Sequence, residues 1–344
     1  MFASMPPAKT KKPDLAARLL AWYDVHRRVL PWRAPAGKRA DPYKVWLSEV
    51  MLQQTRVVAV IEHYHEFLRR FPTVEKLAAA REASVLAAWS GLGYYRRARM
   101  LHAAAKVVVR ELNGKFPTTA KSLLALPGIG RYTAAAIASI AFDEPIAVVD
   151  GNVERVLQRT SGRSLTGEKM WSAAEDLLDR SRPGDFNQAI MELGATVCTP
   201  RAPACLMCPV IDLCATRGEN TKTGKTTPQK KREIHYALSQ TEATQDSCRD
   251  TSPGKIFLVQ RPRDASLLAD MWELPEIPPP HTRAKPALTV RHSITVTDYK
   301  VQVWRSSAPN LTAGQWISLH RLSKLALTGL ARKILRKTGL LTRN

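Results

Sequence analysis

The chain has 344 residues, of which 44% are hydrophobic, and its formal net charge at pH 7 is +22. This length suits about two domains, and the hydrophobic content suits folded cores and argues against a disordered chain. So much positive charge favours a polyphosphate such as nucleic acid over a small acidic ligand. A merely basic surface gives the same balance, so the charge narrows the class of partner and leaves the activity open.

No segment is typical of a signal peptide or of a membrane span. The first residues, MFASMPPAKTKKPDL, lack an apolar core, and no run approaches the roughly 20 apolar residues of a spanning helix. We therefore expect a soluble, intracellular protein without a membrane partner, cytoplasmic and nucleoid-associated if it is bacterial. In that compartment clustered thiols bind metal more often than they form disulfides.

Residues 14–216 have the pattern of an all-α domain, preceded by a flexible basic tail at residues 1–13. Asp14 is the expected N-cap of the first helix, and Asp41-Pro42 has the composition of a cap and first turn of the second. Further helical periodicities follow with short connections, which favours a helical domain of about 200 residues. They lie near residues 75–90, 96–112, 119–125, 131–142, 152–160, 168–180 and 185–197.

The composition changes after residue 216. Residues 217–254 are polar and basic, which is typical of a linker, and they contain Cys248, interpreted as an ordinary free thiol. From residue 255 the pattern is that of strands, and a last helix is expected over residues 322–337. Residues 255–344 are thus predicted to form a small α+β domain, with strands at 255–261, 287–296 and 299–304.

The stretch LPGIGRYTAAAIASIAFDEPIAVVDGNV, residues 126–153, combines a tight turn with a lone carboxylate. Gly128 and Gly130 permit a close backbone approach just before a helix, whose free N–H groups form a ready anion site. Asp150 follows the apolar run 146–149. A phosphate-binding hairpin and an ordinary αα-turn with a capping Asp explain this stretch equally well.

Four of the five cysteines lie close together, with gaps of six, two and five residues, at Cys198, Cys205, Cys208 and Cys214. Zinc is one reading, although zinc sites usually have two Cys-x-x-Cys knuckles on longer spacing. A four-thiolate iron–sulfur cluster suits this compact loop better.

This spacing, directly after a helical domain, resembles that of the endonuclease III family of DNA glycosylases, which carry a structural [4Fe–4S] cluster on these cysteines. The resemblance implies a helix–hairpin–helix at residues 126–137 and a catalytic aspartate at Asp150. Within the family the chain is more similar to MutY-type adenine DNA glycosylases. The matching segments are LPWR (30–33), PYKVWLSEVMLQQTRV (42–57), WSGLGYYRRAR (89–99), LPGIGRYTAAAI (126–137), VDGNVERVL (149–157) and FNQAIMELGA (186–195).

Release of adenine requires a proton on the leaving base and negative charge beside the sugar cation, which two carboxylates supply. Glu49 lies among apolar residues, where desolvation should raise its pKa, and by resemblance it is the general acid toward adenine N7. Asp150, supported by Asn152, would stay ionised and stabilise the sugar cation or form a transient adduct. A solvated helical Glu and a plain cap are the alternatives for Glu49 and Asn152.

Position 132 separates two classes within the family. Members with a lysine there form a Schiff base and nick the strand, whereas this chain has Tyr132. We therefore expect a monofunctional glycosylase, with Tyr132 packed beside the sugar and hydrogen-bonded to Asp150.

The adenine must leave the duplex to be reached. By resemblance Trp32, Arg33, Leu52 and Gln188 line its pocket, and Gln54 and Tyr94 fill the gap in the stack. For Trp32 and Leu52 a place in the plain core is the alternative. Gly91 and Gly93 are expected to form the turn that exposes Tyr94.

The C-terminal domain resembles the Nudix-like domain of the same enzymes, which inspects the base opposite adenine. No glutamate-rich Nudix box is present, so neither metal nor pyrophosphatase activity is expected there. Where the family has Phe-Ser-His, this chain has Ile294, Thr295 and Val296. Ile294 can replace the wedge and Thr295 the hydroxyl, but Val296 cannot replace the imidazole, so we expect a weakened preference for 8-oxoguanine.

The leading interpretation is a monomeric base-excision repair enzyme that binds double-stranded DNA and removes adenine mispaired with 8-oxoguanine or guanine. A glycosylase of the same fold with another base specificity is the first alternative. A noncatalytic iron–sulfur DNA-binding protein is the second, and the presence of both Glu49 and Asp150 argues against it.

Overall fold

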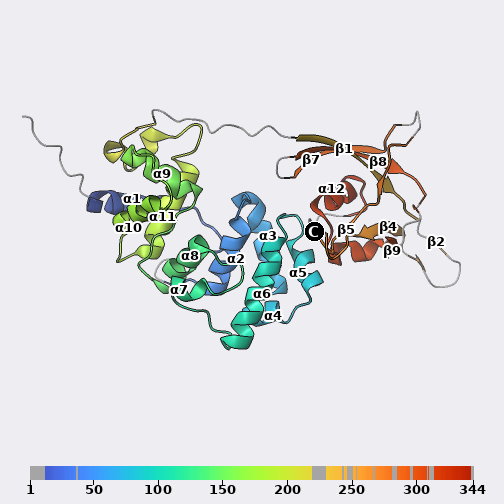
Figure 1. Cartoon of the computed structure of the whole chain (residues 1–344), viewed down its shortest axis with the longest axis horizontal. Helices are drawn as coiled ribbons and strands as arrows, with labels where there is room; N and C mark the ends of the chain where they lie inside the picture. The colour runs from blue at the N-terminus through green and yellow to red at the C-terminus, as the bar shows by residue number, and fades with distance from the viewer. Residues whose placement is uncertain are drawn as a thin grey trace, which may run out of the picture. The chain divides into compact units, whose positions relative to one another are not determined.

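The computed structural model forms two compact units (Figure 1). The first comprises Met1–Tyr64, Thr73–Glu75 and Ala103–Gly224, and the second comprises His65–Pro72, Lys76–His102 and Lys225–Asn344. The structure describes residues 12–35, 38–218, 230–241, 244–245, 251–252, 254–265, 268–280, 285–294, 297–307, 309 and 314–341.

The first unit is helical. Its core packs α1, α8, α9, α10 and α11 around buried side chains such as Leu19, Phe186 and Leu193. Gly184 brings α11 close to α8, because a Cβ there would lie 2.6 Å from the carbonyl oxygen of Ser139. The helices that lie wholly or partly in this unit are α1 (Lys12–His26), α2 (Pro42–Leu52), α3 (Val57–Arg70), α4 (Val74–Ala78), α6 (Arg96–Glu111), α7 (Ala120–Leu123), α8 (Arg131–Phe142), α9 (Gly151–Ser161), α10 (Glu168–Leu177) and α11 (Pro183–Thr196).

Local sequence signals place the helix starts that matter for the site. Asp41 caps α2 and accepts hydrogen bonds from the backbone N–H groups of Tyr43 (2.9 Å) and Lys44 (3.4 Å), and Pro42 occupies the first turn. Gly130 precedes α8 without a side-chain cap, and Gly128 adopts φ 75°, a conformation that favours glycine. The predicted turn between two helices is therefore present.

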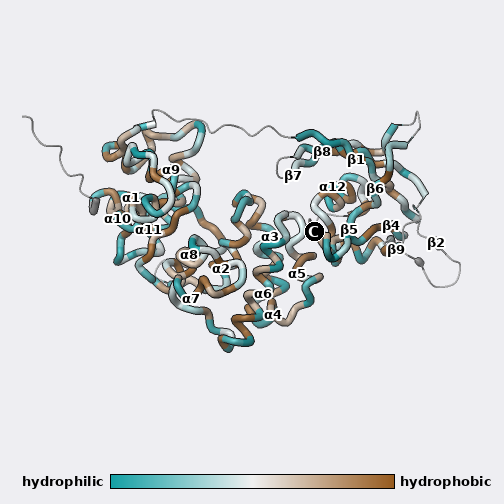
Figure 2. The backbone as a smooth tube through the Cα atoms, viewed as in Figure 1, coloured by the Kyte–Doolittle hydropathy of each residue, from teal (hydrophilic) through white to brown (hydrophobic). Residues whose placement is uncertain are grey.

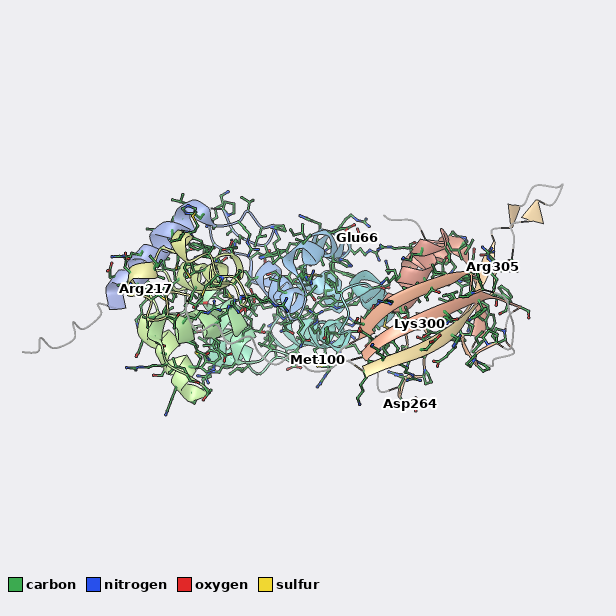
Figure 3. All side chains as sticks on the ribbon, turned by 90° about the horizontal axis from the view of Figure 1, so that it is seen from above. Glu66, Met100, Arg217, Asp264, Lys300 and Arg305 are labelled. Atoms are coloured by element: carbon green, nitrogen blue, oxygen red, sulfur yellow. The ribbon has the colours of Figure 1, made fainter. Side chains whose placement is uncertain are left out.

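The second unit combines the helix α5 (Glu82–Trp89) with a four-stranded sheet in the order β6-β1-β8-β7 and a three-stranded sheet in the order β5-β4-β9. In the first sheet β1 pairs in parallel with β8, and β7 pairs antiparallel with β8. Figure 3 labels Lys300 and Arg305 on β8. The strands of these two sheets are β1 (Lys230–Leu238), β4 (Lys255–Gln260), β5 (Trp272–Glu273), β6 (Glu276–Ile277), β7 (Leu288–Ile294), β8 (Thr297–Arg305) and β9 (Gly314–Ser318).

The core of this unit lies between the sheets and α12 (Gly329–Lys337), which follows a 3-10 helix at Leu319–Lys324. Ile234, Ile256, Val301 and Ile334 are among its buried side chains. Figure 2 shows both hydrophilic and hydrophobic stretches on the elements of this unit. A short separate hairpin pairs β2 (Thr244–Gln245) with β3 (Thr251–Ser252).

The mostly helical fold with a small C-terminal sheet region agrees with the prediction, while several boundaries differ. The periodicity at 75–90 is divided between α4 and α5, and the last helix begins at Gly329. The first helix begins at Lys12, so Asp14 lies in its first turn and is not its cap. No described helix is long and apolar enough to cross a membrane.

The largest difference is β1, a nine-residue strand inside the predicted linker. Its first four residues, Lys230 to Glu233, are exposed and charged, so the apolar alternation is confined to its second half. The strand is stabilised by its parallel pairing with β8, about 60 residues later in the chain, which a local pattern does not reveal. Cys248 and the tail before Lys12 lie outside the described residues.

Candidate active site

Asp150 ends the extended run 146–149 and caps α9. One carboxylate oxygen, Oδ1, accepts hydrogen bonds from the backbone N–H groups of Asn152 (2.9 Å) and Val153 (2.8 Å). The other, Oδ2, accepts one from Asn152 Nδ2 at 2.8 Å. All three donors belong to the first turn of α9, at the N-terminal end of the helix. Asp150 is therefore a helix cap, as one of the two readings predicts, and it also lines a cavity.

Gly194 of α11 lets the start of α9 approach closely. A Cβ at this position would lie 2.6 Å from the Cβ of Asn152 and 3.0 Å from its carbonyl oxygen. Any larger residue would therefore push away the turn that holds Asp150. Close packing of α11 against the start of α9 therefore requires glycine at position 194.

Glu49 belongs to α2 and is only 7% exposed. Burial raises the pKa of this carboxyl to about 7, the hydrogen bond from Tyr132 opposes the rise, and the charge of Asp150 adds to it. A carboxyl with this pKa is protonated about half of the time at neutral pH. The environment predicted for Glu49 from its apolar neighbours is therefore present.

Tyr132, on the first turn of α8, contacts Glu49 directly. Its hydroxyl donates to Glu49 Oε2 at 2.7 Å and lies 3.2 Å from Met191 Sδ. The prediction of a hydrogen bond from Tyr132 to Asp150 was wrong. Among the described residues, the three donors to the Asp150 carboxylate come from Asn152 and Val153. Burial and the neighbouring carboxylates raise the pKa of Tyr132 well above its ordinary value, so it stays a hydrogen-bond donor.

Both carboxylates line one cavity of about 570 Å³ in the first unit. That volume lies in the range of small-molecule pockets, roughly 300–1,000 Å³, so it is ample for a nucleobase with its sugar. The predicted site residues that the cavity brings together are Trp32, Arg33, Glu49, Leu52, Gln54, Tyr132, Asp150, Asn152 and Gln188.

The remaining predicted residues lie elsewhere. Gly128 and Gly130 are in the turn before α8, away from the cavity lining. Tyr94 belongs to the second unit, where it is 46% exposed. Its φ is 48° and that of Gln54 is 55°, uncommon values for residues other than glycine. The side chain of Ile294, together with Thr295 and Val296, lies outside the described part of the chain.

A buried ion pair that the sequence reasoning missed forms one wall. Glu192 is 1% exposed and accepts hydrogen bonds from Arg28 Nε (2.6 Å), Arg28 Nη2 (2.8 Å) and Arg33 Nη2 (2.8 Å). Although burial raises it, these two guanidinium groups lower the pKa of Glu192 overall. Glu192 therefore holds Arg33 at the cavity. The sequence signal for Glu192 was its spacing of four residues from Gln188, which places the two side chains on one face of α11.

Arg155 of α9 is a second missed residue. Its Nη2 donates to Asn152 Oδ1 (2.8 Å) and to the carbonyl of Gly194 (2.7 Å), and its Nε donates to the carbonyl of Cys198 (2.7 Å). One side chain thus joins the residue that supports Asp150 to the start of the cysteine loop. Its place one turn after Asn152 was visible in the sequence, but its distant partners were not.

The four clustered cysteines have free thiols and line a second cavity, with Arg159 and Gly218 among its other walls. Arg159 Nη1 donates to Cys198 Sγ at 3.3 Å. Gly218 has φ 86°, and a Cβ there would lie 2.8 Å from Cys205 Sγ. The donor set therefore fits a thiolate-bound cluster, although no group of three or more metal-binding side chains is arranged to hold a single ion among the described residues.

Comparisons with known proteins show which family the chain resembles. The model of the HhH-GPD superfamily base excision DNA repair proteins matches residues 47–179. The adenine DNA glycosylase of Mus musculus is 42% identical over 76% of this chain and 60% of its own length. That of Schizosaccharomyces pombe is 32% identical over 75% of this chain and 68% of its own length. The chain spans 56% of the length of the Homo sapiens adenine DNA glycosylase.

Solved structures show the same fold. A thermostable thymine-DNA glycosylase is 30% identical, with a TM-score of 0.55 over 59% of this chain and 95% of that structure. A trapped endonuclease III–DNA covalent intermediate is 20% identical, with a TM-score of 0.52 over 61% of this chain and 99% of that one.

Proposed function

Because the chain belongs to the HhH-GPD superfamily of base excision DNA repair proteins, we propose that it is a DNA glycosylase that releases adenine from mispairs in double-stranded DNA. One observation carries the proposal. A buried carboxyl with a pKa of about 7 and a carboxylate held by three donors line the same base-sized cavity. These are the two states that depurination needs.

In the proposed reaction the adenine leaves the stack and enters the cavity. Glu49 donates its proton to N7 as the bond between the sugar C1′ and N9 breaks, and the electron pair of that bond departs with the base. The carboxylate of Asp150 stabilises the positive charge on the sugar or bonds to C1′ transiently. Water then adds at C1′ and gives up a proton to complete the hydrolysis.

Two features support a monofunctional enzyme. Tyr132 cannot form a Schiff base, and its hydroxyl is already bonded to Glu49. No lysine is among the described residues that line the cavity. Strand cleavage without added base or heat would contradict this assignment.

We also propose that Cys198, Cys205, Cys208 and Cys214 bind a [4Fe–4S] cluster, which would tie the loop to the rest of the first unit. The donor set and the arginine at Cys198 Sγ support this. The purified protein should contain iron and sulfide and absorb broadly in the visible range. Cys205→Ser should remove that absorption, whereas Cys248→Ser, at the cysteine outside the cluster, should retain it.

We propose that the C-terminal domain is Nudix-like and reads the base opposite adenine, with a reduced preference for 8-oxoguanine. The antiparallel pair of β7 and β8, which includes the backbone of Ile294, supports this proposal. At the end of this pair Ser293 Oγ donates a hydrogen bond to Asp298 Oδ1. The test is single-turnover base release from duplexes with adenine opposite 8-oxoguanine, guanine or cytosine, and equal rates opposite 8-oxoguanine and guanine would contradict it.

The likeness to a thymine-DNA glycosylase makes thymine the second candidate base. A duplex with thymine opposite guanine therefore belongs in the same assay. Release of adenine by the unaltered chain, lost in Glu49→Gln with DNA binding intact, supports the first candidate. Release of thymine in preference to adenine would replace it by the second.

A further inference from the structure

The turn between α5 and α6 presents Tyr94 in a strained conformation. Tyr94 has φ 48°, and the two glycines before it, Gly91 and Gly93, have φ 113° and 69°. Tyr94 is 46% exposed, so it is one of the large hydrophobic residues at the surface. A non-glycine residue in this region of φ persists only where its surroundings fix it. The contacts around the turn therefore indicate what holds the tyrosine outward.

One set of contacts lies within the turn. Trp89 Nε1 donates to the carbonyl of Gly93 at 3.1 Å. Arg97 Nη2 donates to the carbonyls of Leu92 (3.1 Å) and Gly93 (3.2 Å). The guanidinium of Arg97 also lies over two rings, 5.3 Å from the centroid of Trp89 and 5.6 Å from that of Tyr94. Arg97 therefore links the ring of Tyr94 to Trp89 and to the backbone of the turn.

A second set comes from the C-terminal part of the chain, within the same unit. The residues on both sides of the turn, Ser90 and Tyr95, are each 3% exposed, and both donate to the carbonyl of Leu327, at 2.7 Å and 3.3 Å. Arg332 Nε of α12 donates to Ser90 Oγ at 2.9 Å. The Tyr95 hydroxyl in turn accepts the backbone N–H of Gly91 at 3.4 Å.

The carbonyl of Leu327 is itself fixed by the sheet. The backbone N–H of Trp272 donates to Ala326 (2.8 Å), and the N–H of Thr328 donates back to Trp272 (2.9 Å). These two bonds clamp the residues on either side of Leu327, so its carbonyl is a rigid acceptor. Among the described residues the Arg332 side chain forms no ion pair within 4 Å, and its Nε donates to Ser90 Oγ.

We propose that Ser90, Tyr95 and Arg332 are positioning residues through which the C-terminal domain holds Tyr94 ready to enter the DNA stack. The inference rests on the proposed function, since Tyr94 acts only if the chain removes a base from a duplex. In that setting the domain supports strand insertion directly, in addition to any reading of the opposite base. A displacement of Tyr94 by about 1 Å would remove much of its effect on base release, because insertion into the stack depends on geometry.

The experiment is a double-mutant cycle on Tyr94→Ala and Arg332→Met, measured as single-turnover adenine release. Arg332→Met should slow release from a duplex that contains the adenine mispair and no bubble about tenfold. It should have no further effect once Tyr94 is alanine, because the wedge it positions is gone. Ser90→Ala should behave like Arg332→Met, and Ser90→Thr, which keeps the hydroxyl, should restore most of the rate.

Two controls separate positioning from charge and from folding. Arg336→Met removes an equal charge from an exposed position on the same helix and should leave the rate unchanged. A substrate whose adenine lies in an unpaired bubble needs no wedge, so Arg332→Met should match the unaltered chain on it.

Additive losses in the cycle, equal losses on the bubble or an equal effect of Arg336→Met would overturn the inference. Insertion is also read without base release, from the fluorescence of 2-aminopurine beside the mispair. If the unaltered chain inserts but releases no base, the proposed function fails. If it releases adenine and Arg332→Met inserts normally, only the positioning role fails.

Discussion

Glu49→Gln should make the protein more stable at alkaline pH while abolishing base release. The buried carboxyl of Glu49 has a pKa of about 7, against 4.5 for an ordinary glutamate. A raised pKa in the folded state stabilises the fold below pH 4.5, and this contribution is lost as the pH rises through 7. The difference corresponds to about 3 kcal/mol of destabilisation by the ionised group at pH 8. Glutamine does not ionise, and its carbonyl still accepts the hydrogen bond from Tyr132.

The measurement is the thermal midpoint of both proteins at pH 5 to 8.5. The gap should be small at pH 5 and widen to roughly 5–10 °C at pH 8, with glutamine the more stable. Glu62→Gln, at an exposed position on α3, is the matched control and should show no such divergence. A gap that is independent of pH, or a less stable Glu49→Gln at pH 8, would refute the burial argument.

Three further outcomes follow from the site. Tyr132→Phe removes the hydrogen bond that lowers the pKa of Glu49, so the alkaline fall of the base-release rate should move to higher pH; a pH–rate profile that stays in place would contradict this. Asp150→Asn keeps a residue able to cap α9 but removes the charge beside the sugar, so release should fall about 10²–10³-fold with DNA binding retained, as measured by single turnover and by a binding titration. Gly194→Ala places a Cβ 2.6 Å from that of Asn152, so unfolding free energy should drop by about 1–3 kcal/mol, whereas Gly151→Ala, with open space around its Cβ, should change it little.

The sequence predicted most of the helical elements because their signals are local, whereas the roles of Glu49 and Asp150 were inferred from the family resemblance. Asp41 and Pro42 mark the start of α2, and the glycines before α8 mark its turn. Long segments shared with a known family added the cavity residues. The environment of Glu49 followed from its apolar neighbours on α2 alone.

What the sequence did not reveal depends on residues far apart in the chain. The partner of Tyr132 is Glu49, 83 residues away, and a choice between two carboxylates requires coordinates. Arg28 and Glu192 are 164 residues apart, so the ion pair that holds Arg33 has no local pattern. β1 was missed for the same reason, because its stability comes from β8.

The contacts of Ser90 with Leu327 and Arg332 also bear on the order in which the chain folds. These partners are separated by 237 and 242 residues. During synthesis the turn after α5 is therefore complete long before the groups that hydrogen-bond the hydroxyls of Ser90 and Tyr95 exist, and long-range contacts of this kind form slowly. In a fragment that ends before β1, the hydroxyls of Ser90 and Tyr95 would lose these partners and would be exposed to water. Such a fragment should be more prone to aggregation than the full chain, even though it contains the helices to which the chemistry is proposed to belong.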